Sequence, residues 1–171
     1  MKNLKRVVLF FIFFTFIFSI ILSTTSKATA AENITGNESE NQVIAISDEE
    51  QEVLNLINEY RNENGLEDLT IDKKLQETAK IKADDLVESN YFSHTSPILG
   101  TPFELMKSQG IRYKIAGENL AGNISSQKAV EAWINSKDHR ENILEKKFHK
   151  TGICVVESPV YGKIYVQLFM N

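Results

Sequence analysis

Apolar positions follow a helical period through much of this 171-residue chain. Ser47 and Glu50 form a capping box, and Gly65 closes the segment that follows them. Four apolar residues recur there at helical spacing: Val53, Leu56, Ile57 and Tyr60. A second stripe, with Asp72 as its expected N-cap, comprises Leu75, Ala79, Ala83 and Leu86. We therefore predict two long helices whose apolar stripes face the core.

Shorter helices are expected further along the chain. Pro102 is a good first residue of a short helix. Ser125 or Ser126 caps a helix that carries Trp133 on an apolar stripe, and a last helical turn spans about residues 138–144. Trp133 is accordingly expected to lie in the core.

The end of the chain changes from a helical to a strand pattern. Residues 152–156 and 163–169 are apolar at nearly every position, and residues 160–162 offer a turn between them, which predicts a β-hairpin. A further strand is expected near 111–115, and residues 117–119 are expected to form a turn. Strands that are apolar on both sides are covered on both faces. The predicted fold class is α+β, with a sheet between helical layers.

The start of the chain has the composition of an export signal. Basic residues precede an apolar run at 7–22, and Ala28-Thr29-Ala30 supplies a cleavage site, so residues 1–30 are predicted to be a signal peptide. An uncleaved membrane anchor is the alternative, although a membrane-spanning helix needs about 20 apolar residues. Residues 31–46 are rich in Asn, Glu and Ser and are expected to form a flexible linker, followed by one domain at 47–171.

Removing the predicted signal makes the chain strongly acidic. Four of the 19 Lys and Arg residues, and none of the 23 Asp and Glu residues, lie in residues 1–30, so the remainder has a net charge of −8. Nonspecific nucleic-acid binding relies on Lys and Arg against phosphate, so nucleic acid is not an expected partner. We expect a monomer with no membrane span after cleavage.

Cysteine and histidine content limits the chemistry. Cys154 is the only cysteine, which excludes an internal disulfide, and its place in an apolar strand indicates a core thiol. His94 follows the second helix, His139 begins the last helical turn, and His149 is expected in a surface loop. With Glu118, the first two histidines have the right chemistry for Zn²⁺ ligands or for acid–base groups, and spacing does not decide between these roles.

Five segments of the chain, taken together, carry a family resemblance. They are Asn58-Glu59-Tyr60-Arg61 with Gly65-Leu66, Tyr91-Phe92-Ser93-His94-Thr95-Ser96-Pro97, Gly117-Glu118-Asn119-Leu120-Ala121, Ala132-Trp133-Ile134-Asn135-Ser136 and His139-Arg140-Glu141-Asn142-Ile143-Leu144. In this order they resemble the CAP superfamily (cysteine-rich secretory proteins, antigen 5 and pathogenesis-related proteins of class 1), in its bacterial, disulfide-free, SCP-like branch. The resemblance covers about residues 51–170 and implies an α-β-α sandwich with a central, mainly antiparallel sheet and a cleft.

The resemblance also implies a cleft tetrad of two histidines and two acids, which binds a divalent cation in some members. His94, Glu118 and His139 match three of these positions. The second acid of many members falls on Ser136 here, and Asp138 is a candidate substitute. Zn²⁺ or another divalent cation is therefore one occupant that the set allows. In the alternative, the three residues form a hydrogen-bonded cluster that orders the cleft.

These observations favour a secreted or cell-surface bacterial CAP domain. No nucleophile accompanies the tetrad residues, so we expect a non-enzymatic module whose cleft binds a ligand or partner such as a lipid, a peptide or a cell-wall component. The alternative is a divalent-metal-dependent hydrolase in which His94, Glu118 and His139 activate a water. A third interpretation is an envelope-associated structural module with an inert cleft.

Overall fold

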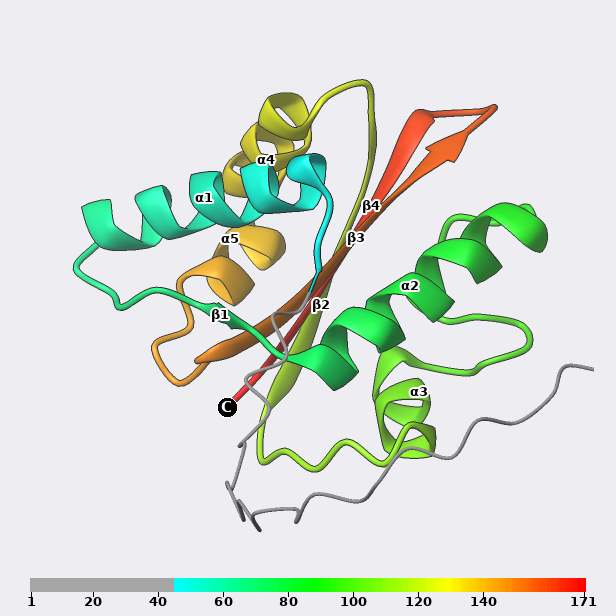
Figure 1. The fold of residues 1–171 in the computed structure, drawn as a ribbon, viewed down its shortest axis with the longest axis horizontal. Coiled ribbons are helices and arrows are strands. Elements are labelled where there is room, and N and C mark those ends of the chain that lie inside the picture. Colours follow the sequence, from blue (N-terminus) through cyan, green and yellow to red (C-terminus); the bar gives the residue numbers. More distant parts are fainter. Residues whose placement is uncertain (1–44) are drawn as a thin grey trace, which may run out of the picture. The chain divides into compact units, whose positions relative to one another are not determined.

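The computed structural model describes residues 45–171. The predicted signal peptide, and the predicted linker except for its last two residues, lie outside the described residues. The elements are α1 Asp48–Glu63, β1 Thr70–Ile71, α2 Lys73–Glu88, α3 Pro102–Ser108, β2 Ala116–Asn123, α4 Ser126–Asn135, α5 Lys137–Ile143, β3 Lys150–Ser158 and β4 Gly162–Met170 (Figure 1). Within residues 45–171, no helix is both long and apolar enough to cross a bilayer.

The predicted helix starts are confirmed at the level of single hydrogen bonds. Ser47 Oγ accepts from Glu50 N at 3.2 Å, and Glu50 Oε2 accepts from Ser47 N at 2.9 Å, which completes the capping box of α1. Asp72 caps α2, and Ser125 rather than Ser126 caps α4. These side chains bind N–H groups that have no partner inside the helix, so the caps fix where each helix begins.

The sheet has the order β1-β3-β4-β2. β3 and β4 form the predicted antiparallel hairpin, β2 pairs with β4 antiparallel, and only the short β1 is parallel to its neighbour. Two expectations for the middle of the chain are wrong. The strand expected at 111–115 begins instead at Ala116, and it runs through residues 117–119, which were expected to form a turn. Pairing along the whole of β4 overrides the weak strand propensity of Gly and Asn.

Helices cover both faces of this sheet, as the continuous apolar strands predict. α1, α4 and α5 lie on one face, and α2 and α3 lie on the other (Figure 1). Neighbouring strand residues divide between the two layers: Ile153 and Tyr165 pack with α1 and α4, while Cys154 and Val166 pack with α2. The α-β-α sandwich is therefore confirmed, and Cys154 is a buried core thiol.

Gly152 allows α2 to lie close against β3. A Cβ at this position would lie 2.2 Å from the carbonyl carbon of Leu75 and 2.3 Å from its oxygen. The Gln76 side chain also bonds to β3, where its Oε1 accepts from Ile153 N at 2.8 Å. This close packing fixes the first turn of α2 against the sheet, and the loop carrying His94 follows the opposite end of the same helix.

Candidate functional site

His94, Glu118 and His139 meet at one edge of the sheet, and we call these three residues the His94 site. Glu118 lies on the edge strand β2, His94 in the loop after α2, and His139 on α5 from the opposite layer. His94 Nδ1 lies 2.7 Å from Glu118 Oε1, and the centroids of the two imidazole rings are 6.3 Å apart. The Glu118 side chain is 2% exposed and that of His94 is 54% exposed, so a buried carboxylate supports an accessible ring.

Alternation along β2 explains how both layers contribute to the site. Glu118 lies on the side of α2 and binds His94, whereas Asn119 points to the side of α5. Asn119 Nδ2 donates to the backbone oxygen of His139 at 3.1 Å, and Asn142 Nδ2 donates to Asn119 Oδ1 at 2.9 Å. Two consecutive residues of one strand therefore position the two histidines from opposite faces.

Side chains also protect the free edge of β2. Asn142 Nδ2 donates to the Glu118 backbone oxygen at 3.2 Å, and Trp133 Nε1 donates to that of Leu120 at 2.9 Å. Gly117 leaves room for the first of these, because a Cβ there would lie 2.8 Å from Asn142 Oδ1. Unpaired backbone groups at a sheet edge invite pairing with another chain, so these bonds hold the edge closed and the site in place.

Lys82 fixes the loop that carries His94, and the sequence patterns alone did not single it out. Its side chain is buried, and Nζ donates to the backbone oxygens of Ser93 at 2.8 Å and His94 at 3.0 Å. Nζ also donates to Tyr91 Oη at 2.9 Å, and Tyr91 donates in turn to Asp85. A lysine at a core-facing position of the α2 stripe was the available signal, since a charge is seldom buried without partners.

The electrostatics of the site separate its two histidines. The hydrogen bond to Glu118 raises the pKa of His94 above its ordinary value near 6.5. Burial lowers the pKa of His139, and the charge of His94 lowers it further. Burial also raises the pKa of Glu118, against the opposing effects of His94 and Lys82. His94 therefore keeps its proton to a higher pH than His139 does.

A pH titration followed by NMR should show this separation directly. We expect His94 to titrate above 6.5 and His139 below it. Glu118→Gln removes the carboxylate and should lower the pKa of His94, whereas Glu88→Gln, a change at an exposed acid at the end of α2, should leave it in place. A His94 pKa that does not respond to Glu118→Gln would contradict the pairing.

The same shift has a consequence for stability. Because the pKa of His94 is higher in the folded protein than in the unfolded chain, its contribution to the free energy of unfolding is complete below the ordinary value near 6.5. That contribution is lost as the pH rises through the folded-state pKa.

No hydroxyl or thiol of the described residues is placed as a nucleophile at the His94 site. Within residues 45–171, no Ser, Thr or Cys side chain is hydrogen bonded to His94 or His139. Ser93 Oγ, next to His94, accepts from Thr95 N at 3.3 Å instead. Cys154 is buried in β3, and burial raises the pKa of its thiol to about 12. Nucleophilic catalysis needs an activated nucleophile beside its base, and this arrangement does not supply one.

The fit of a metal ion depends on how many donors converge. Across residues 45–171, no three His, Cys, Asp or Glu side chains form a group that could hold a metal ion. Glu118 Oε1 is committed to His94, which is the role of a residue that orients a ligand. Ser136 is the N-cap of α5, and Asp138 is exposed. The described residues therefore do not form the three protein ligands that a catalytic zinc site uses. Metal binding stays a prediction that a titration can test.

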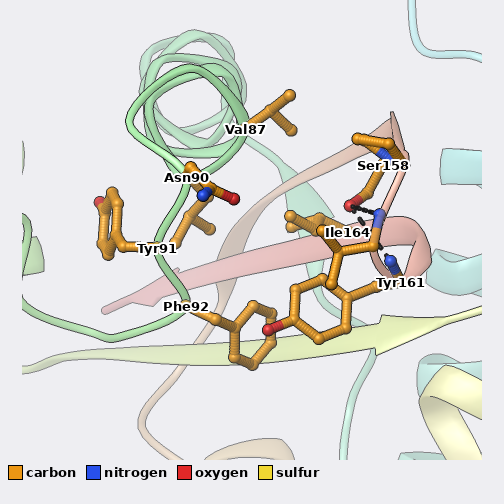
Figure 2. A pocket seen from close by; sticks show the side chains of 10 residues that line it. Val87, Asn90, Tyr91, Phe92, Ser158, Tyr161 and Ile164 are labelled. Carbon is orange, nitrogen blue, oxygen red and sulfur yellow. Dashed lines mark hydrogen bonds between the residues drawn. The ribbon is translucent and has the colours of Figure 1, made fainter.

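A pocket lined by both polar and apolar groups lies beside the loop that carries His94. Its volume is about 160 Å³. It is lined by the end of α2, by the residues that follow α2 and by the β3–β4 turn. Figure 2 shows Phe92 and Tyr161 side by side among the residues that line it. Their ring centroids are 4.9 Å apart, and the residues are 39% and 40% exposed. Exposed aromatic pairs are common at recognition surfaces, and Phe92 is only two residues from His94.

Known proteins resemble this chain in sequence and in fold. Residues 54–169 match the family profile described as CAP, Cysteine-rich secretory protein family. The chain is 42% identical over 150 residues to the Bacillus subtilis protein YkwD, an alignment that covers 87% of this chain and 57% of that protein. The chain thus spans just over half the length of this relative.

Solved structures share the fold. An extracellular protein containing a SCP domain from Bacillus anthracis str. Ames superimposes with a TM-score of 0.65 at 32% identity, over 72% of this chain and 40% of that one. An outer surface protein from Borrelia burgdorferi gives a TM-score of 0.66 at 28% identity, over 74% of this chain and 96% of that one. Both superpositions therefore extend over most of the domain that carries the His94 site.

Proposed function

This chain belongs to the CAP, or cysteine-rich secretory protein, family, and on that premise we propose that it binds a ligand or partner at the His94 site outside the cell. The site is a recognition point and not a catalytic centre in this proposal. The extracellular and outer-surface descriptions of two similar structures support a secreted or surface location.

One observation carries the proposal: a buried carboxylate oxygen beside an accessible imidazole. Glu118 Oε2 is buried and has no hydrogen-bond partner among residues 45–171. Nδ1 of His94 is occupied by Oε1, which leaves Nε2 as the ring nitrogen free to bind. An unpaired buried acceptor is costly to a fold and calls for an explanation. A bound hydroxyl or amide group, which both donates and accepts, would bind Nε2 of the exposed ring, and it would satisfy Oε2 of Glu118 once the side chains that cover that oxygen move aside.

The pocket beside the loop that carries His94 supports a ligand of mixed character. Phe92 and Tyr161 present aromatic surface, Phe92 within two residues of His94, while the exposed His94 ring presents a polar group. Binding sites commonly combine an apolar lining with a few placed polar groups that fix orientation. A peptide, a lipid or a cell-wall fragment with an apolar group next to a hydroxyl or amide would match both.

Site-specific photo-cross-linking in the exporting cells tests the proposal. A photoreactive amino acid replaces Thr95, which is exposed and next to His94. We expect an adduct that is lost when His94→Ala is added, because the ligand then loses its anchor. A photoreactive residue at Lys128, exposed on α4, serves as the control and should give no adduct that depends on His94.

Two results would overturn the proposal. If no adduct at position 95 depends on His94, while the variant unfolds at the urea concentration of the parent, the site is inert. If the purified protein turns over peptide, ester or cell-wall substrates and His94→Ala abolishes that turnover, the protein is an enzyme. Either outcome replaces binding with one of the other two interpretations.

The metal-dependent hydrolase remains the alternative, and calorimetry with Zn²⁺ separates it from the proposal. Two histidines without a third ligand are expected to bind Zn²⁺ no more tightly than about millimolar, since catalytic zinc sites use three protein ligands. A tighter site that His139→Ala removes would favour the hydrolase. The same titration on His149→Ala, a change at a surface histidine, is the matched control.

A further inference from the structure

A cluster of cations lies where β2 begins and β4 ends. We call it the basic hollow, and its positively charged or titratable members are Arg112, Lys114, Lys146, Lys147 and His149. One depression of about 640 Å³ is lined by Lys114, Ile115, Lys146, Lys147, His149 and Asn171. An adjoining one of about 330 Å³ is lined by Arg112, Tyr113, Lys114 and Asn171. None of these residues belongs to the His94 site.

Hydrogen bonds to the backbone hold the three segments of the basic hollow together. Asn171 Oδ1 accepts from the backbone N–H of Lys114 at 2.8 Å and of Ile115 at 3.1 Å. His149 N donates to the backbone oxygen of Met170 at 3.1 Å. The segment before β2, the loop before β3 and the end of β4 are thus tied to one another. The cations project from a framework with a defined shape.

Within residues 45–171, no acidic side chain pairs with the cations of the basic hollow. No acidic side chain lines either depression. Within residues 45–171, Arg112, Lys114, Lys146 and Lys147 make no ion pair. The nearest acid along the chain, Glu145, uses Oε1 to accept from the backbone N–H of Lys147 at 2.9 Å. In a chain with more acids than bases, this concentrates positive potential at one place.

We propose that the basic hollow binds a soluble polyanion with repeated phosphodiester groups. The two adjoining depressions share Lys114 and each contains at least one further cation. A ligand with several anionic groups in a row can therefore contact several cations at once, which a single small ion cannot do. Three of the four permanent cations are lysines. Lysine binds phosphate as a point charge from a flexible stem, whereas a carboxylate is matched best by the planar fork of arginine. This composition favours a flexible phosphate polymer.

The surroundings argue against a membrane and against single-stranded nucleic acid. Within residues 45–171, the large exposed apolar residues all lie outside the basic hollow: Phe92, Ile98, Phe103, Ile124, Val160 and Tyr161. Attachment to a bilayer surface combines charge with apolar insertion, which the basic hollow does not offer. Single-stranded nucleic acid is bound by successive aromatic platforms. Here only Tyr113 is present, half-buried, with its hydroxyl donating to the backbone oxygen of Phe103.

Fluorescence anisotropy with a labelled poly(glycerol phosphate) oligomer tests the proposal, using protein expressed from the full chain. Four cations that each release about 0.7 counterions give a log–log salt slope of about −2.8, which is about a 50-fold loss of affinity between about 50 and 200 mM salt. The variant K114A/K146A/K147A should weaken binding at least about tenfold and reduce the slope to about −0.7.

A matched variant and three competitors make the outcome decisive. K107A/K128A/K137A removes the same charge from exposed lysines elsewhere and should leave both affinity and slope close to the parent values. Equal loss in the two variants would show a nonspecific charge effect and overturn the proposal. So would equal affinity for poly(glutamate), tighter binding to oligo(dT), or binding restricted to phosphatidylglycerol vesicles. None of these results bears on the His94 site, so the two proposals fail independently.

Discussion

Replacing Arg61 by Met is expected to lower the free energy of unfolding by about 3–5 kcal/mol. Arg61 lies on α1 and is buried, with 1% of its surface exposed. Its guanidinium donates to four backbone oxygens: Glu67 at 2.9 Å, Ile143 at 2.6 Å, Glu145 at 3.2 Å and Phe148 at 3.2 Å. One side chain thus joins α1 to the end of α5 and to the loop before β3.

The size of the effect follows from what the substitution leaves behind. Methionine fills part of the volume of Arg61 but donates no hydrogen bonds. The buried carbonyls that accepted from the guanidinium then keep their desolvation cost without a partner, at about 1–3 kcal/mol for each group that stays buried. Partial rearrangement of the loop lets water reach some of these carbonyls, so the total loss of stability is smaller than the sum of the four separate costs.

Urea unfolding monitored by the single tryptophan, Trp133, measures this loss. Arg112→Met is the matched control, because Arg112 is exposed, and we expect a change within about 0.5 kcal/mol for it. Arg61→Lys should recover only a small part of the loss, since an ammonium cannot reproduce the fork of donors. If Arg61→Met unfolds at the midpoint of the parent, Arg61 does not tie these segments together.

Replacing Lys82 by Met is expected to cost about 2–4 kcal/mol and to loosen the loop that carries His94. The substitution leaves the backbone oxygens of Ser93 and His94 without their donor. It also removes the cation that faces Asp85, whose carboxylate accepts from Tyr91 and from Ser89 Oγ at 3.0 Å. A buried network that loses one member is weakened by more than a single bond.

Hydrogen exchange separates this local effect from a general loss of stability. In Lys82→Met, the exchange rate should increase more for the amides of residues 91–96 than for the amides of β3 and β4. Lys80→Met is the control on the same helix, because Lys80 is exposed and pairs only with Asp84 at the surface; its expected cost is below about 1 kcal/mol. Unchanged exchange in residues 91–96 would contradict a role for Lys82 in positioning His94.

The helices and the hairpin could be predicted from the sequence because their signals are local. The capping box at Ser47, the cap at Asp72 and the apolar runs of β3 and β4 depend on neighbours within a few residues. β2 could not be predicted in this way. Its Gly-Glu-Asn segment has the composition of a turn, and it becomes a strand only through pairing with β4 across the full length of both.

The three residues of the His94 site could be picked out from the sequence motifs, but their arrangement in space could not. The ordered motifs single out His94, Glu118 and His139, while spacing leaves open whether they bind metal, transfer protons or form a cluster. The structure shows the hydrogen bond between His94 and the buried Glu118. It also shows that no three His, Cys, Asp or Glu side chains of residues 45–171 form a group that could hold a metal ion. The buried cation Lys82, on which the His94 loop depends, carries no motif at all.

The sequence by itself determined the family and the caps of the two long helices, and it supplied the candidate site residues, because each of these depends on short-range order along the chain. Tertiary structure alone decided that Glu118 is buried and half unpaired, that Arg61 and Lys82 bind backbone oxygens far from their own helices, and that cations from three separate segments share one hollow. Burial and the convergence of charges are properties of groups brought together in space, and their pKa values and binding chemistry follow from that proximity.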